Sequence, residues 1–342
     1  MKIKFLICQC LFYLSLNGSD WTWTYSMRFD SKMSEQSDNK KEINFSKIEV
    51  PEYSQLIFSW NAIRPRKGIF TFWAQFRDSK TKEWQPWYKM MEWGDGFQKS
   101  FCSKGPNGSG YYFVRLETGD NFFSDGFRIK VEISGDANLS DLKYCSVCVS
   151  NLKKLKFNDE NQCYENCESI LIRNVPEISQ MQQDHPRKTE ICSPTSLSMV
   201  TNFLSKQNVD TLNFVDNVFD SGFGIYGNWS LNVAHAFEKC GGEFFCKVSR
   251  FNSFMELHKY LMQQIPVVVS VRGVLKGAAK EHPGGHLLVV VGWDKRKKQV
   301  VCHDPAFENN DQVFHKYEFE DFIKAWNLSR NLVYVFDKNN LN

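Results

Sequence analysis

The stretch QMQQDHPRKTEICSPTSLSMVTNFL, residues 180–204, places a cysteine between a polar, turn-prone segment and a more apolar run. The apolar residues of the run recur at roughly helical spacing: Leu197, Met199, Val200, Phe203 and Leu204. Cys192 is therefore predicted at the start of a helix, where unpaired N–H groups and aligned peptide dipoles favour the nucleophilic thiolate. Taken alone, one cysteine among 11 is more often a buried apolar side chain or a disulfide partner.

The length and charge of the chain limit its class. A chain of 342 residues exceeds one typical domain, so we expect two domains, each with its own core. The formal net charge is only +3, and the one basic cluster, KRKK at 295–298, lies between two apolar β-like runs. This pattern indicates a solvated hairpin turn, so nucleic-acid binding is not predicted.

The N-terminus resembles an export signal. Two lysines precede an apolar stretch of about a dozen residues, long enough for a signal-peptide core and too short to span a bilayer. Residues 1–19 are therefore predicted as a signal peptide, with a secreted or cell-envelope location; without cleavage the location would be cytoplasmic. No later stretch predicts an integral membrane segment, and the polar residues 20–45 predict a flexible lead-in.

Residues 46–150 predict an all-β domain. Short alternating runs such as LIFSW, GIFTFWAQFRD and FRIKVEIS are separated by turn-forming clusters, which is typical of an antiparallel β-sandwich. The segment is rich in aromatic residues: Trp60, Trp73, Trp84, Trp87, Tyr88, Trp93, Tyr111 and Tyr112. They either fill the core and its edges or form a platform for carbohydrate or peptide.

Four cysteines near the end of this segment have a zinc-like spacing: Cys145, Cys148, Cys163 and Cys167. However, KYCSVCVSNL reads as a strand, in which residues three apart point to opposite faces. Disulfides, or a mixture of buried and surface thiols, are favoured over a metal site. The polar residues 151–170 are predicted to form a linker.

Residues 171–338 predict an α+β domain with helices in its first half and an antiparallel sheet in its second. The expected helices lie near 193–205, 211–219, 230–239, 253–264 and 318–327. The expected strands lie near 266–271, 286–293, 299–303 and 332–336.

A nucleophilic cysteine needs a base, a group that orients the base and donors for an oxyanion. His286 follows two glycines and opens the apolar run HLLVVVGW, so it is predicted at a strand end over a cleft. Asp304 ends the next strand, VVCHDP, and would reach the same edge if the two strands form a hairpin. Oxyanion donors are the backbone N–H of Cys192 and one of Gln180, Gln182 and Gln183; spacing does not choose among the three.

A second histidine, His282, lies four residues before His286, which is the spacing of a zinc-peptidase pair on a helix. Pro283, Gly284 and Gly285 would break such a helix, so a metallopeptidase is not predicted. No metal or cofactor is expected.

Four motifs together resemble the papain-like cysteine peptidases of family 39, in particular stand-alone bacterial C39-like domains that follow an N-terminal β-sandwich. The motifs are NVPEISQ, ICSPTSLSMV, GGHLLVVVGWD and VCHDPAF, within residues 171–337. The resemblance implies an all-β sandwich domain followed by an α+β papain-like cysteine peptidase domain. It implies that Gln180 donates to the oxyanion, Cys192 is the nucleophile, His286 is the general base and acid, and Asp304 orients it.

One departure from the family's pattern is Ser193, where many members have glycine. We expect its side chain to crowd the oxyanion site or the substrate backbone. The predicted activity is cleavage of a peptide or isopeptide bond in a peptide or protein substrate, cell-wall peptide included. The alternatives are an acyltransferase, such as a transpeptidase, on the same triad and a binding protein with an inactive papain-like domain.

Overall fold

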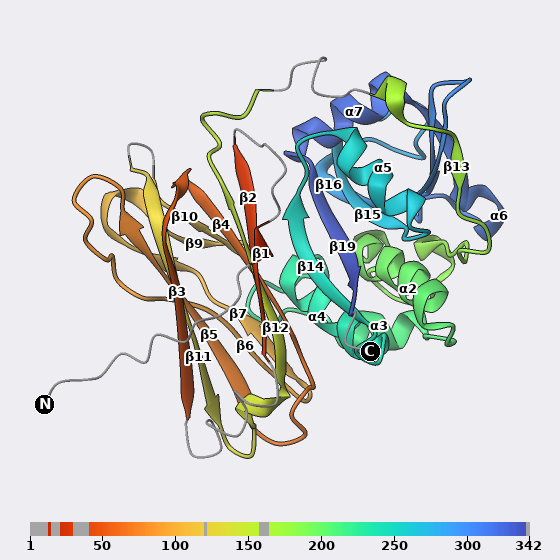
Figure 1. Ribbon diagram of the computed structural model, residues 1–342. Helices are drawn as coiled ribbons and strands as arrows, with labels where there is room; N and C mark the ends of the chain where they lie inside the picture. The colour runs from red at the N-terminus through yellow and green to blue at the C-terminus, as the bar shows by residue number, and fades with distance from the viewer. Residues whose placement is uncertain (1–12, 15–20, 30–40, 120–121, 157–163, 340–342) are drawn as a thin grey trace, which may run out of the picture.

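The computed structural model describes residues 13–14, 21–29, 41–119, 122–156 and 164–339. These residues form three antiparallel sheets and a set of helices that belongs to the second half of the chain (Figure 1). Apart from Tyr13–Leu14, the predicted signal peptide at 1–19 lies outside the described residues. No helix in the described residues is long and apolar enough to cross a bilayer.

Two sheets make up the N-terminal part. The first has the order β1-β2-β12-β4-β10-β9-β8, and the second has the order β3-β11-β5-β6-β7. The bounds in the first sheet are β1 Tyr13–Leu14, β2 Thr22–Arg28, β4 Gln55–Ala62, β8 Ser103–Lys104, β9 Gly110–Tyr112, β10 Arg115–Glu117 and β12 Leu142–Ser150. Those in the second sheet are β3 Glu42–Tyr53, β5 Ile69–Asp78, β6 Tyr88–Gly94, β7 Phe97–Ser100 and β11 Ser124–Ser134.

Aromatic side chains join these two sheets face to face. Trp60 of β4 lies with its ring centroid 4.2 Å from that of Phe72 on β5 and 5.7 Å from that of Trp93 on β6. These residues belong to one buried cluster that draws on both sheets. Burial of these three large rings adds apolar area that stabilises such a domain.

The aromatic residues of the N-terminal part divide into two groups. Trp60, Tyr88, Trp93 and Tyr111 are buried. Cationic side chains lie over the rings of several half-exposed ones: Arg128 is 3.8 Å from the Trp84 centroid, and Lys130 is 4.8 Å from that of Trp73. A sugar ring stacking on these faces would have to displace the cations.

The prediction of a flexible lead-in at residues 20–45 is wrong at both ends of that range. β2 pairs with β12 along its whole length, and β3 begins at Glu42. The short sequence TWTYSMR alternates apolar with polar residues and pairs with β12. This tertiary pairing outweighs the weak strand propensity of the segment itself. Residues 30–40 of the lead-in lie outside the described residues.

The third sheet has the order β14-β19-β15-β16-β17-β18, with β13 paired to β16. The strands are β13 Ile170–Leu171, β14 Phe244–Arg250, β15 Val267–Gly273, β16 His282–Asp294, β17 Gln299–His303, β18 Phe314–Glu318 and β19 Leu332–Lys338. The helices are α2 Cys192–Ser205, α3 Thr211–Asp216, α4 Trp229–Lys239, α5 Phe254–Met262, α6 Asn310–Val313 and α7 Phe319–Leu328. The KRKK cluster forms the turn between β16 and β17.

The predicted linker at 151–170 also needs a correction at its C-terminal end. The Tyr164 ring packs against Phe319 and Trp293, at centroid distances of 4.4 and 5.8 Å, and Cys167 is buried. These residues therefore belong to the core of the second part. Cys145 and Cys148 are buried in different clusters on opposite faces of β12, as the strand pattern predicts, and Cys163 lies outside the described residues.

All eight residues of β4 are buried, although its sequence QLIFSWNA alternates apolar with partly polar residues. One face fills the core between the two N-terminal sheets. The other face contacts α4 and β14 of the second part. There the Asn61 amide donates to the Cys246 carbonyl oxygen at 2.8 Å and accepts from the Cys246 N–H at 2.8 Å.

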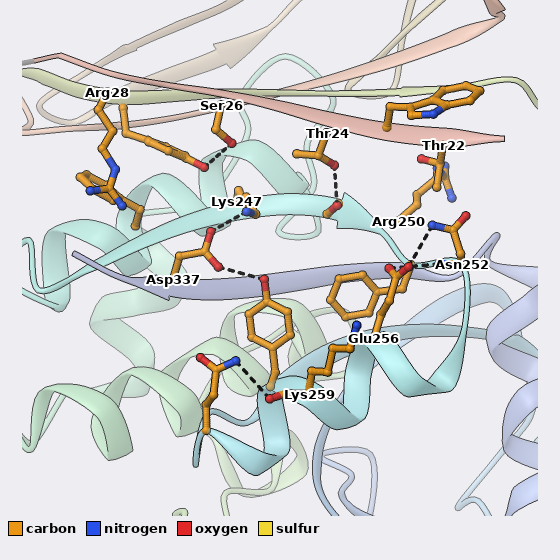
Figure 2. Close-up of a pocket in the computed structure, with 17 residues that line it drawn as sticks. Thr22, Thr24, Ser26, Arg28, Lys247, Arg250, Asn252, Glu256, Lys259 and Asp337 are labelled. Carbon is orange, nitrogen blue, oxygen red and sulfur yellow. Dashed lines mark hydrogen bonds and ion pairs between the residues drawn. The ribbon is translucent and has the colours of Figure 1, made fainter. Parts of the chain in front are cut away.

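A pocket of about 360 Å³ remains where β2 faces β14 and α5 (Figure 2). Among its lining residues, the amine of Lys247 pairs with Asp337, whose second oxygen accepts from the Tyr260 hydroxyl at 2.9 Å. The pocket lies at the junction of the two parts. None of the predicted catalytic residues lines it.

The Asn61 contact predicts that the junction contributes to global stability. In Asn61→Leu the N–H and C=O of Cys246 would each lose a partner in a buried place, so we expect the free energy of unfolding to fall by about 2–5 kcal/mol. Urea unfolding measures this loss. Asn44→Leu, at an exposed asparagine of β3, is the control. Equal stability of the two variants would contradict the prediction.

Candidate active site

Cys192 is the first residue of α2, as predicted from the sequence. Its own side chain is partly exposed, while the nine residues that follow are buried. Pro194, in the first turn, has no N–H to lose there and its fixed φ suits a helix start. The fold thus buries the helix and leaves its N-terminal thiol accessible.

His286 lies inside β16, opposite Val271 of β15, and is 3% exposed. The prediction that it opens the strand is wrong, because β16 begins four residues earlier, at His282. The pairing of β16 with β15 shifts in register between the His286–Val271 pair and the His282–Gly273 pair. Gly285 lies within this shift with a φ of +98°, which glycine tolerates because it has no side chain. His286 therefore has residues of β16 before and after it in the chain, and β15 pairs with its backbone.

Asp304 follows β17 directly and is fully buried. Its Oδ1 lies 2.7 Å from Nε2 of His286 and accepts from the Ala306 N–H at 2.9 Å. Its Oδ2 accepts from the Tyr317 hydroxyl at 2.6 Å. A buried carboxylate without such donors would be strongly destabilising, and here three donors satisfy it. Tyr317 was not predicted from the sequence, because its role depends on the pairing of β17 with β18.

The electrostatics of the three residues favour an ion pair. Burial opposes the charge on His286, but the Asp304 carboxylate and contacts with Cys192 raise the pKa of His286 to about 10. Burial also opposes the Cys192 thiolate, yet a hydrogen bond to His286, its charge and the Leu287 N–H lower the pKa of the thiol. Because Nε2 of His286 faces Asp304, its Nδ1 is the ring nitrogen left for Cys192.

Gln180 is the one buried member of the three candidate glutamines. Its N–H donates to the Pro305 carbonyl oxygen at 2.9 Å, which places it beside the Asp304 turn. One hydrogen of its amide goes to the Lys188 carbonyl oxygen at 2.8 Å, and the second is left for another acceptor. Gln182 instead donates to Asn309, and Gln183 donates to the Ser179 carbonyl oxygen.

Ser193 does not occupy the position expected from the sequence. Its side chain is fully buried and points into the domain, where Oγ donates to Oδ1 of Asn232 at 3.0 Å and lies 3.1 Å from the Tyr334 hydroxyl. The expectation that it crowds the oxyanion site or the substrate backbone is therefore wrong.

His282 stacks on His286, with ring centroids 4.1 Å apart and planes inclined by 8°. Burial, followed by the charge of His286, lowers the pKa of His282 to about 4, so the ring is neutral at pH 7. Nitrogen and oxygen atoms of His282, His286 and Asp304 lie within 4.8 Å of one another, which is near enough to suggest a metal group. However, both oxygens of Asp304 already have protein donors, and a cation would have to displace them.

Residues 172–334 match the model of the Peptidase_C39 like family. A solved structure described as a C39-like peptidase from Bacillus anthracis aligns with a TM-score of 0.38 and 18% identity, covering 50% of this chain and 98% of the other. No curated protein matches the chain. The family match supports a C39-like peptidase domain over residues 172–334, preceded in this chain by a β-rich N-terminal part.

Proposed function

We propose that the protein is a cysteine peptidase in which Cys192, His286 and Asp304 form the catalytic triad. The observation that carries the proposal is the 2.7 Å contact between Nε2 of His286 and Oδ1 of Asp304. Cys192 is hydrogen-bonded to the same imidazole. This arrangement supplies a nucleophile, a base and an orienting carboxylate. Membership of a peptidase family supports a peptide or protein substrate.

In the first half of the reaction, the Cys192 thiolate attacks the carbonyl carbon of the scissile amide and forms a C–S bond. The carbonyl oxygen becomes an oxyanion, and the proton on Nδ1 of His286 passes to the departing nitrogen. The C–N bond then breaks, leaving a thioester on Cys192 and a free amine.

In the second half, neutral His286 takes a proton from water, and the hydroxide attacks the thioester carbon. The C–S bond breaks, the acid product leaves, and the thiolate and imidazolium are restored. Donors for the oxyanion are the N–H of Cys192, at a helix start where N–H groups lack intrahelical acceptors, and the second amide hydrogen of Gln180. An amine in place of water would give the acyltransferase reaction on the same residues.

The first prediction concerns the acidity of the thiol. Because His286 lowers the pKa of Cys192, alkylation of the native protein by iodoacetamide should reach half its maximal rate below the ordinary thiol pKa. In His286→Ala the midpoint should rise, since the Cys192 thiolate loses its counter-charge. Mass spectrometry resolves the modified cysteines, and Cys246, whose pKa is raised by burial, serves as the unreactive reference. A midpoint unchanged by the substitution would rule out the ion pair.

The second prediction concerns the pH profile of peptide hydrolysis. kcat/KM should rise with pH as Cys192 ionises and fall near pH 10, where His286 loses its proton. Asp304→Asn removes the charge that holds this proton, so the alkaline limb should move to lower pH and kcat should fall by about 10²–10⁴-fold. Asp311→Asn, at an exposed acid of α6, is the matched control. An alkaline limb that stays in place would argue against the assigned role of Asp304.

A peptide library with and without a labelled amine separates the two reaction types. Hydrolysis that depends on Cys192 and yields only acid products supports the peptidase. Amide adducts in preference to acid products would assign the acyltransferase instead. No turnover of any peptide, together with an ordinary thiol pKa, would favour the inactive binding protein.

A further inference from the structure

The N-terminal part contacts the loop that leads into α4, residues 217–228. Gly222 lies so close to β7 that a Cβ there would be 2.0 Å from the Ser100 carbonyl oxygen. Both the N–H and the hydroxyl of Ser221 donate to the Gln98 carbonyl oxygen, at 3.1 and 2.8 Å. The edge strand of one sheet thus holds a loop of the peptidase domain along its backbone.

The loop and the strand share a buried carboxylate. Asp220 is fully buried, and its Oδ1 accepts from the N–H of Ser100 and from that of Gly222, each at 2.9 Å. Its Oδ2 accepts from the amide of Asn228 at 2.7 Å. The Asp220 carboxylate accepts from three donors away from solvent, so it has one stable orientation. It therefore fixes the loop against β7.

Asn228 transfers this restraint to α4. Its amide nitrogen donates to Asp220 and, at 2.6 Å, to the Ser100 hydroxyl. Its Oδ1 accepts from the N–H groups of Ser230 and Leu231, as an N-cap does. The start of α4 is therefore bonded through one side chain to a strand of the N-terminal part.

Asn232, one turn further along α4, completes the connection to the nucleophile. Its amide nitrogen donates to the carbonyl oxygens of Asn228 and Tyr226, each at 2.8 Å, and its Oδ1 accepts from the Ser193 hydroxyl. Ser193 directly follows Cys192 in α2. All members of this connection are buried: Ser100, Asp220, Asn228, Asn232 and Ser193. We call these five residues the polar chain.

We infer that the N-terminal part positions the catalytic nucleophile through the polar chain, with Asp220, Asn228, Asn232 and Ser193 as positioning residues. The inference rests on the proposed function and assigns the β-rich part a role in the same reaction. The Ser193 hydroxyl is the group of α2 that bonds to Asn232. Fixing the start of α2 fixes the Cys192 thiol against His286 and its N–H against the oxyanion, and small displacements there are costly in rate.

The matched pair Ser193→Ala and Ser198→Ala tests the inference. Both serines are buried in α2, but Ser198 bonds to Thr195 and Thr211 within the peptidase domain. We expect similar losses of stability from the two variants, because each loses buried hydrogen bonds. Only Ser193→Ala should lower kcat, by about three- to tenfold with little change in KM, and shift the pH midpoint of Cys192 alkylation.

Asp220→Asn tests the connection at its far end, among residues that do not touch Cys192. The NH₂ group of the new asparagine would face the N–H of Ser100 or Gly222, or the amide NH₂ of Asn228, and two donors cannot bond to each other. We therefore expect kcat to fall by about three- to tenfold. In the double variant with Ser193→Ala, the loss should stay within about twofold of the larger single loss. Independent sites would instead multiply their losses.

The outcomes separate this inference from the proposed function. If wild-type Cys192 has an ordinary pKa and no peptide is cleaved, the proposed function fails. If the wild type is active and Ser193→Ala behaves like Ser198→Ala in kcat and alkylation, the polar chain is only structural and the inference is overturned. Multiplicative losses in the double variant would overturn it too.

Discussion

Burial of the polar face of β4 is the constraint on which the arrangement of this chain depends. Asn61 and Ser59 alternate with the large apolar residues that fill the N-terminal core. Such a face is stable in a dry interior only when other groups supply matching donors and acceptors. Strand β14 supplies them, and Arg250 adds a bond to Gln55 at 2.7 Å. The two parts of the chain are therefore joined by directional bonds in addition to apolar contact.

The same requirement explains the organisation of the proposed catalytic residues. Asp304 carries a full charge away from water, and its donors Tyr317, Ala306 and His286 come from three different elements. Each donor restricts the carboxylate, and the carboxylate in turn restricts the imidazole. The pKa of Asp304 is held well below its usual range although burial opposes this, chiefly because His286 is charged beside it. Electrostatic preorganisation of this kind is costly in folding and useful in catalysis.

Local patterns in the sequence were sufficient to locate the main elements of the site. The start of α2 at Cys192, the strand that carries His286 and the strand that ends before Asp304 follow from apolar periodicity, glycine and proline. The bounds of β16 could not be predicted, because its pairing with β15 resumes at His282, beyond Pro283–Gly285, whose strand propensity is low. Tyr317 depends on sheet register, and the true direction of Ser193 depends on a partner 39 residues away. Strand β14, FFCKVSR, was not predicted, because its burial on both faces removes the alternation that marks a strand.

The bonds of Asn61 have a further consequence for β14, which is the last strand of its sheet. A terminal strand presents unpaired N–H and C=O groups that can recruit a strand from another molecule. The Asn61 amide occupies both such groups of Cys246, and the Ser59 hydroxyl accepts from the N–H of Val248 at 3.3 Å. The N-terminal part thereby covers an edge at which peptidase domains could otherwise add to one another, and so guards the protein against aggregation.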